Sequence, residues 1–285
     1  MGMKTFIFKG LKTKYMTAGA GEPLIFLHNA AGDHTIWEGQ IKYFMKTHRV
    51  YAVDLPGFGG SERPPSGLTL DFFTEFLDAF IMSEHLYGVT IAGVGTGAGI
   101  ALNYGATHPS RARRLVLINP ATFNTVLAGP SGILYWRISR KKAAHRLIKA
   151  ASARITLPRF ITEYWIKKQF KKGYDVPRGL MSHLVSLFTK KESMRVLFDV
   201  LENFEGFKKL DDPLSVDASP PSILVWGCEN RVLPSWAGDD LGKIIKPHKK
   251  IFLEGCGHLL MIEKNGDLNE IIREFIAKKN EPAVL

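Results

Sequence analysis

Short apolar runs alternate along the chain with longer segments in which apolar residues recur every three or four positions. The runs that we expect to form strands lie at residues 5–8, 14–17, 24–28, 50–54, 89–93, 114–119, 223–227 and 251–254. The expected helices lie at residues 36–45, 69–85, 96–108, 234–245 and 267–279, the last with Asp267 as N-cap and Glu270 completing a capping box. This alternation predicts an α/β fold with a mostly parallel sheet, preceded by a hairpin around Gly10.

The alternation stops between residues 121 and 210, where the pattern is helical and no convincing strand occurs. The turn-forming residues Asp211, Asp212 and Pro213 precede the point at which strands resume. We therefore predict one sheet domain made of residues 1–120 and 211–285. A helical cap, residues 121–210, is inserted into it.

The net charge of +11 belongs almost entirely to the expected cap. Residues 121–205 carry 16 Lys and Arg against 6 Asp and Glu, whereas the rest of the chain carries 22 against 21. The cations form two groups: Arg137, Arg140, Lys141, Lys142, Arg146 and Lys149, and then Lys167, Lys168, Lys171 and Lys172. A solvated face, contact with an anionic membrane surface and attraction of acidic small ligands all fit this charge. We expect no nucleic-acid partner, because no binding motif accompanies it.

Two cysteines in 285 residues exclude a disulfide scaffold. The chain shows neither a signal-peptide pattern nor an apolar stretch of about 18 residues, so we expect a cytoplasmic protein, peripheral to the membrane if the cap binds lipid. Cys228, Cys256 and His258 lack the spacing of zinc ligands, and the glycine-rich residues 57–60 lack the context of a nucleotide loop. The sequence therefore predicts no metal and no cofactor, and leaves the oligomeric state open.

Five motifs follow the expected strands in a fixed order. They are H-N-A-A-G at 28–32, D-L-P-G-F-G-G-S at 54–61, G-V-G-T-G at 93–97, G-C-E-N at 227–230 and G-C-G-H at 255–258. Together they resemble the α/β-hydrolase fold, in its cap-bearing branch. The resemblance implies a mostly parallel eight-stranded sheet flanked by helices. The elbow at 93–99 also resembles that of the NDR (N-myc downstream-regulated) proteins, which are thought to lack hydrolase activity.

The resemblance assigns a catalytic triad of which only one member is present. The nucleophile position of the elbow falls on Gly95, which has no side chain to attack a carbonyl. The acid position falls on Asn230, and a neutral amide cannot stabilise an imidazolium as a carboxylate does. His258 stands at the histidine position, and Glu229 is an alternative source of a carboxylate.

An oxyanion hole does not need the missing side chains. By position, its two donors would be the backbone amides of Ala30 and Thr96, with His28 and Asn29 in the same loop as Ala30. Amide donors at a helix N-terminus favour a negatively charged oxygen. A bound carboxylate, carbonyl or enolate could therefore still be recognised.

Three hypotheses follow, and whether the protein is an enzyme stays open among them. The first is a degenerate hydrolase, a pseudoenzyme that binds a small lipophilic or acidic carbonyl compound. The second is an enzyme of hydrolase, lyase or cofactor-free oxygenase type with His258 as general base; Cys228 or Cys256 could replace the nucleophile only with a lowered pKa. The third is an interaction or membrane-surface protein that acts through its basic cap.

Overall fold

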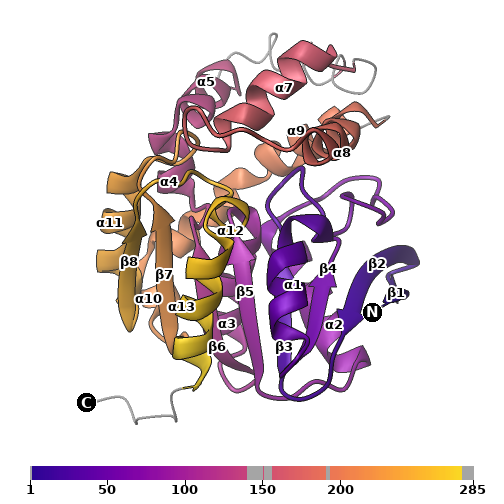
Figure 1. The fold of residues 1–285 in the computed structure, drawn as a ribbon, viewed down its shortest axis with the longest axis vertical. Helices are drawn as coiled ribbons and strands as arrows, with labels where there is room; N and C mark the ends of the chain where they lie inside the picture. The colour runs from indigo at the N-terminus through magenta and orange to yellow at the C-terminus, as the bar shows by residue number, and fades with distance from the viewer. Residues whose placement is uncertain (1, 140–149, 151–155, 191–192, 278–285) are drawn as a thin grey trace.

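The computed structural model describes residues 2–139, 150, 156–190 and 193–277 of the chain. Its centre is an eight-stranded sheet in the order β1-β2-β4-β3-β5-β6-β7-β8 (Figure 1). The strands are β1 (Gly2–Phe8), β2 (Leu11–Ala18), β3 (Pro23–Leu27), β4 (Arg49–Val53), β5 (Val89–Val94), β6 (Ala112–Ile118), β7 (Ser222–Gly227) and β8 (Lys249–Leu253). Six neighbouring strands, β4, β3, β5, β6, β7 and β8, run parallel to one another. Strand β2 pairs with β4 in the antiparallel direction. The predicted α/β fold with a mostly parallel sheet is confirmed.

The chain enters the sheet through the hairpin expected around Gly10. Phe8 pairs with Leu11, so the turn contains only Lys9 and Gly10. Both turn residues have positive φ, at 48° and 82°. A two-residue turn with positive φ at both positions has a backbone twist that matches the right-handed twist of the two antiparallel strands it joins.

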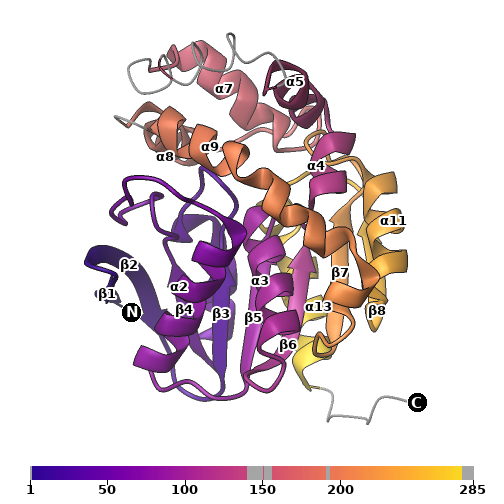
Figure 2. The ribbon, with the colours of Figure 1, turned by 180° about the vertical axis from the view of Figure 1, so that it is seen from behind.

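Helices cover both faces of the sheet, and each face has its own apolar core. On one face α2 (Leu70–Ser83), α3 (Thr96–Thr107) and α11 (Ser235–Ile245) pack against inward side chains such as Ile91 and Trp226 (Figure 2). On the other face η1 (His34–Trp37), α1 (Glu38–Phe44), α12 (Leu260–Glu263) and α13 (Asn265–Ala277) cover Phe26 and Val116. Neighbouring strand residues alternate between the two cores, and this explains the continuous apolar runs in the sequence.

Several helices from the described part of the segment between β6 and β7 lie over the carboxyl ends of the strands (Figure 1). They are α4 (Phe123–Ala128), α5 (Pro130–Ser139), α7 (Arg159–Lys168), α8 (Arg178–Thr189) and α9 (Ser193–Glu202). The chain then returns along the sheet through η2 (Phe204–Asp211) and α10 (Pro213–Val216), where Phe207 and Leu210 are buried in the core of α2 and α3. Of the first basic group, all members except Arg137 lie outside the described residues.

The predicted start of the last helix is wrong. Helix α13 begins at Asn265, two residues before the expected N-cap Asp267, so Asp267 lies in the first turn instead. A carboxylate there still interacts favourably with the positive end of the helix dipole. Among the described residues, no helix combines the length and the apolar character needed to span a membrane.

Candidate functional site

The candidate site begins at the sharp turn that joins β5 to α3. Gly95 occupies this turn with φ 54° and ψ −119°, a conformation that costs a side-chain-bearing residue about 1–3 kcal/mol. The turn packs tightly on the end of β3, since a Cβ added at Gly97 would lie 2.4 Å from the Leu27 carbonyl oxygen. The backbone of a nucleophile elbow is therefore present, without the nucleophile.

His258 faces the position where that nucleophile would be attached. A Cβ built on Gly95 would lie 3.0 Å from Nε2 of His258 and 3.0 Å from Cβ of Asn29. Both contacts are tighter than ordinary van der Waals packing, so even a methyl group would need its neighbours to shift slightly. The glycine thus leaves room for less than one extra side-chain atom, and the imidazole closes the space.

Asn230 determines which nitrogen of His258 carries the proton. Its Oδ1 accepts hydrogen bonds from the backbone amides of Val232 (2.9 Å) and Leu233 (3.0 Å). Rotating the amide group by 180° would set its NH₂ against those two donors, so the observed orientation is the favourable one. Nδ2 of Asn230 therefore points at Nδ1 of His258, 3.2 Å away, and donates to it.

The consequence is that Nδ1 of His258 is an acceptor and the proton of the neutral ring sits on Nε2. Burial lowers the pKa of His258 to about 4, which keeps the ring neutral near pH 7. In this state Nε2 presents an N–H toward Gly95, not a lone pair. The arrangement disfavours the hypothesis that His258 acts there as a general base, because its basic lone pair faces Asn230.

Two further residues hold the histidine, and neither belongs to the motifs named above. Asn119, at the end of β6, donates from Nδ2 to the His258 carbonyl (2.9 Å) and accepts from the Gly227 amide (3.1 Å). Gln169, just after α7, accepts the backbone amides of His258 (2.8 Å) and Leu259 (3.0 Å) on its own carbonyl oxygen. The one available signal was a polar residue directly after an apolar strand, and it applies only to Asn119.

The loop after β3 lies against the elbow and is fixed by its own hydrogen bonds. His28 is fully buried; Nδ1 bonds to the Asn29 carbonyl (2.7 Å) and Nε2 accepts from the Leu55 amide (2.9 Å). Burial lowers the pKa of His28, so the ring stays neutral and serves the loop. Asn29 donates to Oε1 of Gln169 at 2.9 Å, so this loop is tied to the residue that holds His258.

The expected amide donors lie on either side of this junction. Thr96 is the first residue of α3, where an amide has no acceptor within the helix. Ala30 follows Asn29 in the loop that touches Gly95 and is half-buried. Thr96 and His258 are therefore direct neighbours of Gly95, and Ala30 follows Asn29, which contacts Gly95.

The alternative nucleophiles and acids are not suited to chemistry here. Burial raises the pKa of Cys256 to about 12, and burial with the nearby Glu254 and Glu229 also raises the pKa of the exposed Cys228. Both thiols therefore stay protonated. Glu229 is exposed, whereas its neighbour Asn230 contacts His258. Within the described part of the chain, no group of three or more His, Cys, Asp or Glu residues could hold a metal ion.

Comparison with known proteins gives the family. The model of the alpha/beta hydrolase family matches residues 24–271, which is most of the chain. The chain belongs to this family. The part of the resemblance that concerns the fold is thereby confirmed, and the local likeness of the elbow to NDR proteins is not shown.

Individual relatives in the alpha/beta hydrolase family are distant. The AB hydrolase superfamily protein YisY of Bacillus subtilis (strain 168) is 25% identical over 90% of this chain and 92% of its own. The 2-hydroxymuconate semialdehyde hydrolase of Pseudomonas sp. (strain CF600) is 24% identical over 99% of this chain and 96% of its own. A solved serine hydrolase involved in carbazole degradation superposes with a TM-score of 0.76 at 20% identity, covering 97% of this chain and 98% of that one.

Proposed function

We propose that this alpha/beta hydrolase family member binds a small lipophilic acid or carbonyl compound and does not carry out serine-hydrolase chemistry. The observation that carries the proposal is the hydrogen bond from Asn230 Nδ2 to His258 Nδ1. It turns the histidine into a hydrogen-bond donor toward Gly95. In a Ser-His-Asp triad Nε2, the nitrogen that here donates toward Gly95, must instead accept the proton of the nucleophile.

We propose that three donors contact one ligand oxygen, and that Asn29 and His258 shift to admit it, since the space at Gly95 is smaller than one atom. Nε2 of His258 supplies one N–H, and the backbone amides of Ala30 and Thr96 supply the others. A site with donors alone suits a carboxylate or a polarised carbonyl, because such an oxygen accepts several hydrogen bonds at once. The ligand is held by these contacts and is not attacked, since Gly95 offers no nucleophile.

The names of the relatives agree with this class of ligand. One is a hydrolase of 2-hydroxymuconate semialdehyde, and another, from Metapseudomonas resinovorans, is a hydrolase of a 2-hydroxy-6-oxo-dienoic acid. Both names describe compounds with carbonyl groups. We propose that this chain keeps recognition of such compounds and lacks their hydrolysis.

We further propose that residues 121–210 act as the cap of this site. Gln169 supports the proposal, because it lies in that segment and holds both His258 and Asn29. His183 of α8 also bonds to Asp33 beside the oxyanion loop, with 2.9 Å between Nε2 and Oδ2. A cap held to the site by these contacts would cover a bound ligand.

A fluorophosphonate probe, which labels activated serines, tests the proposal. The wild-type chain should stay unlabelled, whereas the double variant Gly95→Ser with Asn230→Asp should be labelled. The matched control is Gly95→Ala with Asn230→Asp, which brings the same backbone strain and the same carboxylate without a hydroxyl. Labelling or ester hydrolysis by the wild-type chain, abolished by His258→Ala, would contradict the proposal.

A further inference from the structure

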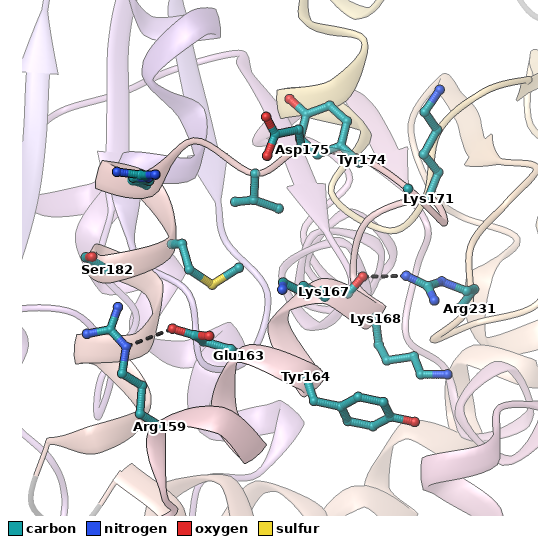
Figure 3. A pocket seen from close by; sticks show the side chains of 14 residues that line it. Arg159, Glu163, Tyr164, Lys167, Lys168, Lys171, Tyr174, Asp175, Ser182 and Arg231 are labelled. Carbon is teal, nitrogen blue, oxygen red and sulfur yellow. Dashed lines mark hydrogen bonds and ion pairs between the residues drawn. The ribbon is translucent and has the colours of Figure 1, made fainter.

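A pocket lies between α7 and α8, and Gly95, Asn230 and His258 are not among the residues that line it. It has a volume of about 780 Å³ and is lined by side chains of both helices, of the segment between them and of the loop after β7 (Figure 3). Six of its lining residues are cations: Arg159, Lys167, Lys168, Lys171, Arg178 and Arg231. Only two, Glu163 and Asp175, are acidic, so the lining carries a net charge of +4.

Most of these cations have no carboxylate partner. Arg159 bonds to Glu163, with 2.7 Å between Nε and Oε1. Lys167, Lys171 and Arg178 form no ion pair with any described residue, although the Lys171 charge acts on the nearby carboxylate of Glu263, which accepts from the Lys171 backbone amide at 2.8 Å. Lys168 lies over the ring of Tyr164, 5.2 Å from its centre. By contrast, Lys243 and Lys250 on the sheet domain both pair with Asp239. Unpaired cations around one pocket repel each other, and a bound anion would relieve that repulsion.

Arg231 is held in the pocket before any ligand arrives. Its Nε and Nη2 donate to the Phe170 carbonyl at 3.2 and 2.9 Å, and Nη2 also donates to the Lys167 carbonyl (Figure 3). These neutral acceptors fix the guanidinium without neutralising it. Because its position is already ordered, an anion bound there need not order this side chain.

The pocket also has an apolar part. Met181 is buried and Val176 half-buried in its wall, and the rings of Tyr164 and Tyr174 border it. A ligand that satisfies the whole lining therefore combines more than one negative charge with an apolar group. Arginine and lysine side chains bind the oxygens of phosphate especially well.

We propose that this pocket binds a small phosphate monoester with an aromatic or aliphatic tail. The phosphate contacts Lys171, Arg178 and Arg231, and the tail lies against Met181 and the tyrosine rings. This inference does not depend on the function proposed for the site around His258. It concerns a different ligand class and a different set of side chains.

Calorimetric titration with phenyl phosphate tests the proposal. The wild-type chain should bind it, and the variant Lys171→Gln with Arg178→Gln should bind it at least about tenfold more weakly. The matched control is Lys4→Gln with Lys46→Gln, which removes the same charge from exposed positions of the sheet domain. That control should keep the wild-type affinity within about twofold.

Three results would overturn the proposal. The first is no binding of phenyl phosphate by the wild-type chain at about 10 mM. The second is equal weakening in both double variants, which would mean attraction to the overall charge. The third is co-sedimentation with phosphatidylglycerol vesicles by a chain that does not bind phenyl phosphate, since the basic residues would then serve a membrane surface.

Discussion

The region around His258 and the pocket between α7 and α8 position their hydrogen-bond donors in different ways. Around His258 the polar side chains are buried and neutral, and each is fixed by neighbouring amides and carbonyls. Between α7 and α8 the donors are charged, and several have no ionic partner among the described residues. The first region is organised by geometry, and the second by an excess of charge.

The difference has consequences for how each region responds to its surroundings. Hydrogen bonds between buried neutral groups depend little on salt, and they fail when one partner is removed or changes its protonation state. Attraction between exposed charges is screened over about 8 Å at physiological ionic strength. The region of His258 should therefore respond to mutation and to pH. Binding in the pocket should respond to the salt concentration.

The largest effect expected concerns positions 95 and 230. The double variant Gly95→Ser with Asn230→Asp should hydrolyse p-nitrophenyl acetate with a kcat about 10⁴-fold above that of Gly95→Ser alone, because Asn230 imposes the wrong tautomer on His258. Steady-state kinetics of both variants measure the ratio. Equal activity of the two variants would show that Asn230 does not control the histidine.

The stability of the protein should depend on pH through His258. Its pKa is about 4 in the folded chain and about 6.5 when unfolded, so between these values only the unfolded state binds the proton. The stabilisation is complete above pH 6.5 and is lost as the pH falls toward 4, by about 3 kcal/mol in total. Urea unfolding of wild type and His258→Gln at several pH values measures it; parallel curves would contradict the prediction.

A smaller effect is expected from the contact that joins Asn29, in the loop after β3, to Gln169. A double-mutant cycle with Asn29→Ala and Gln169→Ala should give a coupling free energy of about 1 kcal/mol. The exposed pair Glu38 and Lys42 on α1 is the control, and its coupling should be smaller because water screens it. Equal couplings would remove the distinction between the two kinds of contact.

The smallest effect expected is the response of the pocket to salt. Raising sodium chloride from about 0.05 to 0.5 M should weaken phenyl phosphate binding several-fold, because the contacts are between exposed charges. Titrations at both salt concentrations measure the change. An affinity that does not depend on salt would mean that the apolar wall around Met181 dominates binding.

The fold could be predicted from the sequence because the apolar runs of a parallel sheet are long and distinctive. Runs such as 89–93 and 223–227 became β5 and β7 within one residue at each end. The start of α13 was missed because Asn265 and Asp267 are both good N-terminal residues, and only packing chooses between them.

The candidate site was predictable only in part. Motif order brought Gly95, Asn230 and His258 together, but the protonation of the histidine depends on the amides of Val232 and Leu233, which no sequence pattern reveals. Gln169 lies 89 residues before His258 and contacts it through a backbone carbonyl. A backbone carbonyl can make this contact in any residue type, so the identity of residue 169 does not reveal the contact.

The nitrogen resonances of His258 test the central claim most directly. In a long-range ¹⁵N–¹H spectrum at pH 7, assigned by comparison with His258→Gln, Nδ1 should resonate as an unprotonated nitrogen and Nε2 as a protonated one. In the Asn230→Asp variant the two should exchange roles, because the carboxylate accepts from Nδ1. A wild-type spectrum with the proton on Nδ1 would contradict the account, since Nε2 would then be free to act as a base.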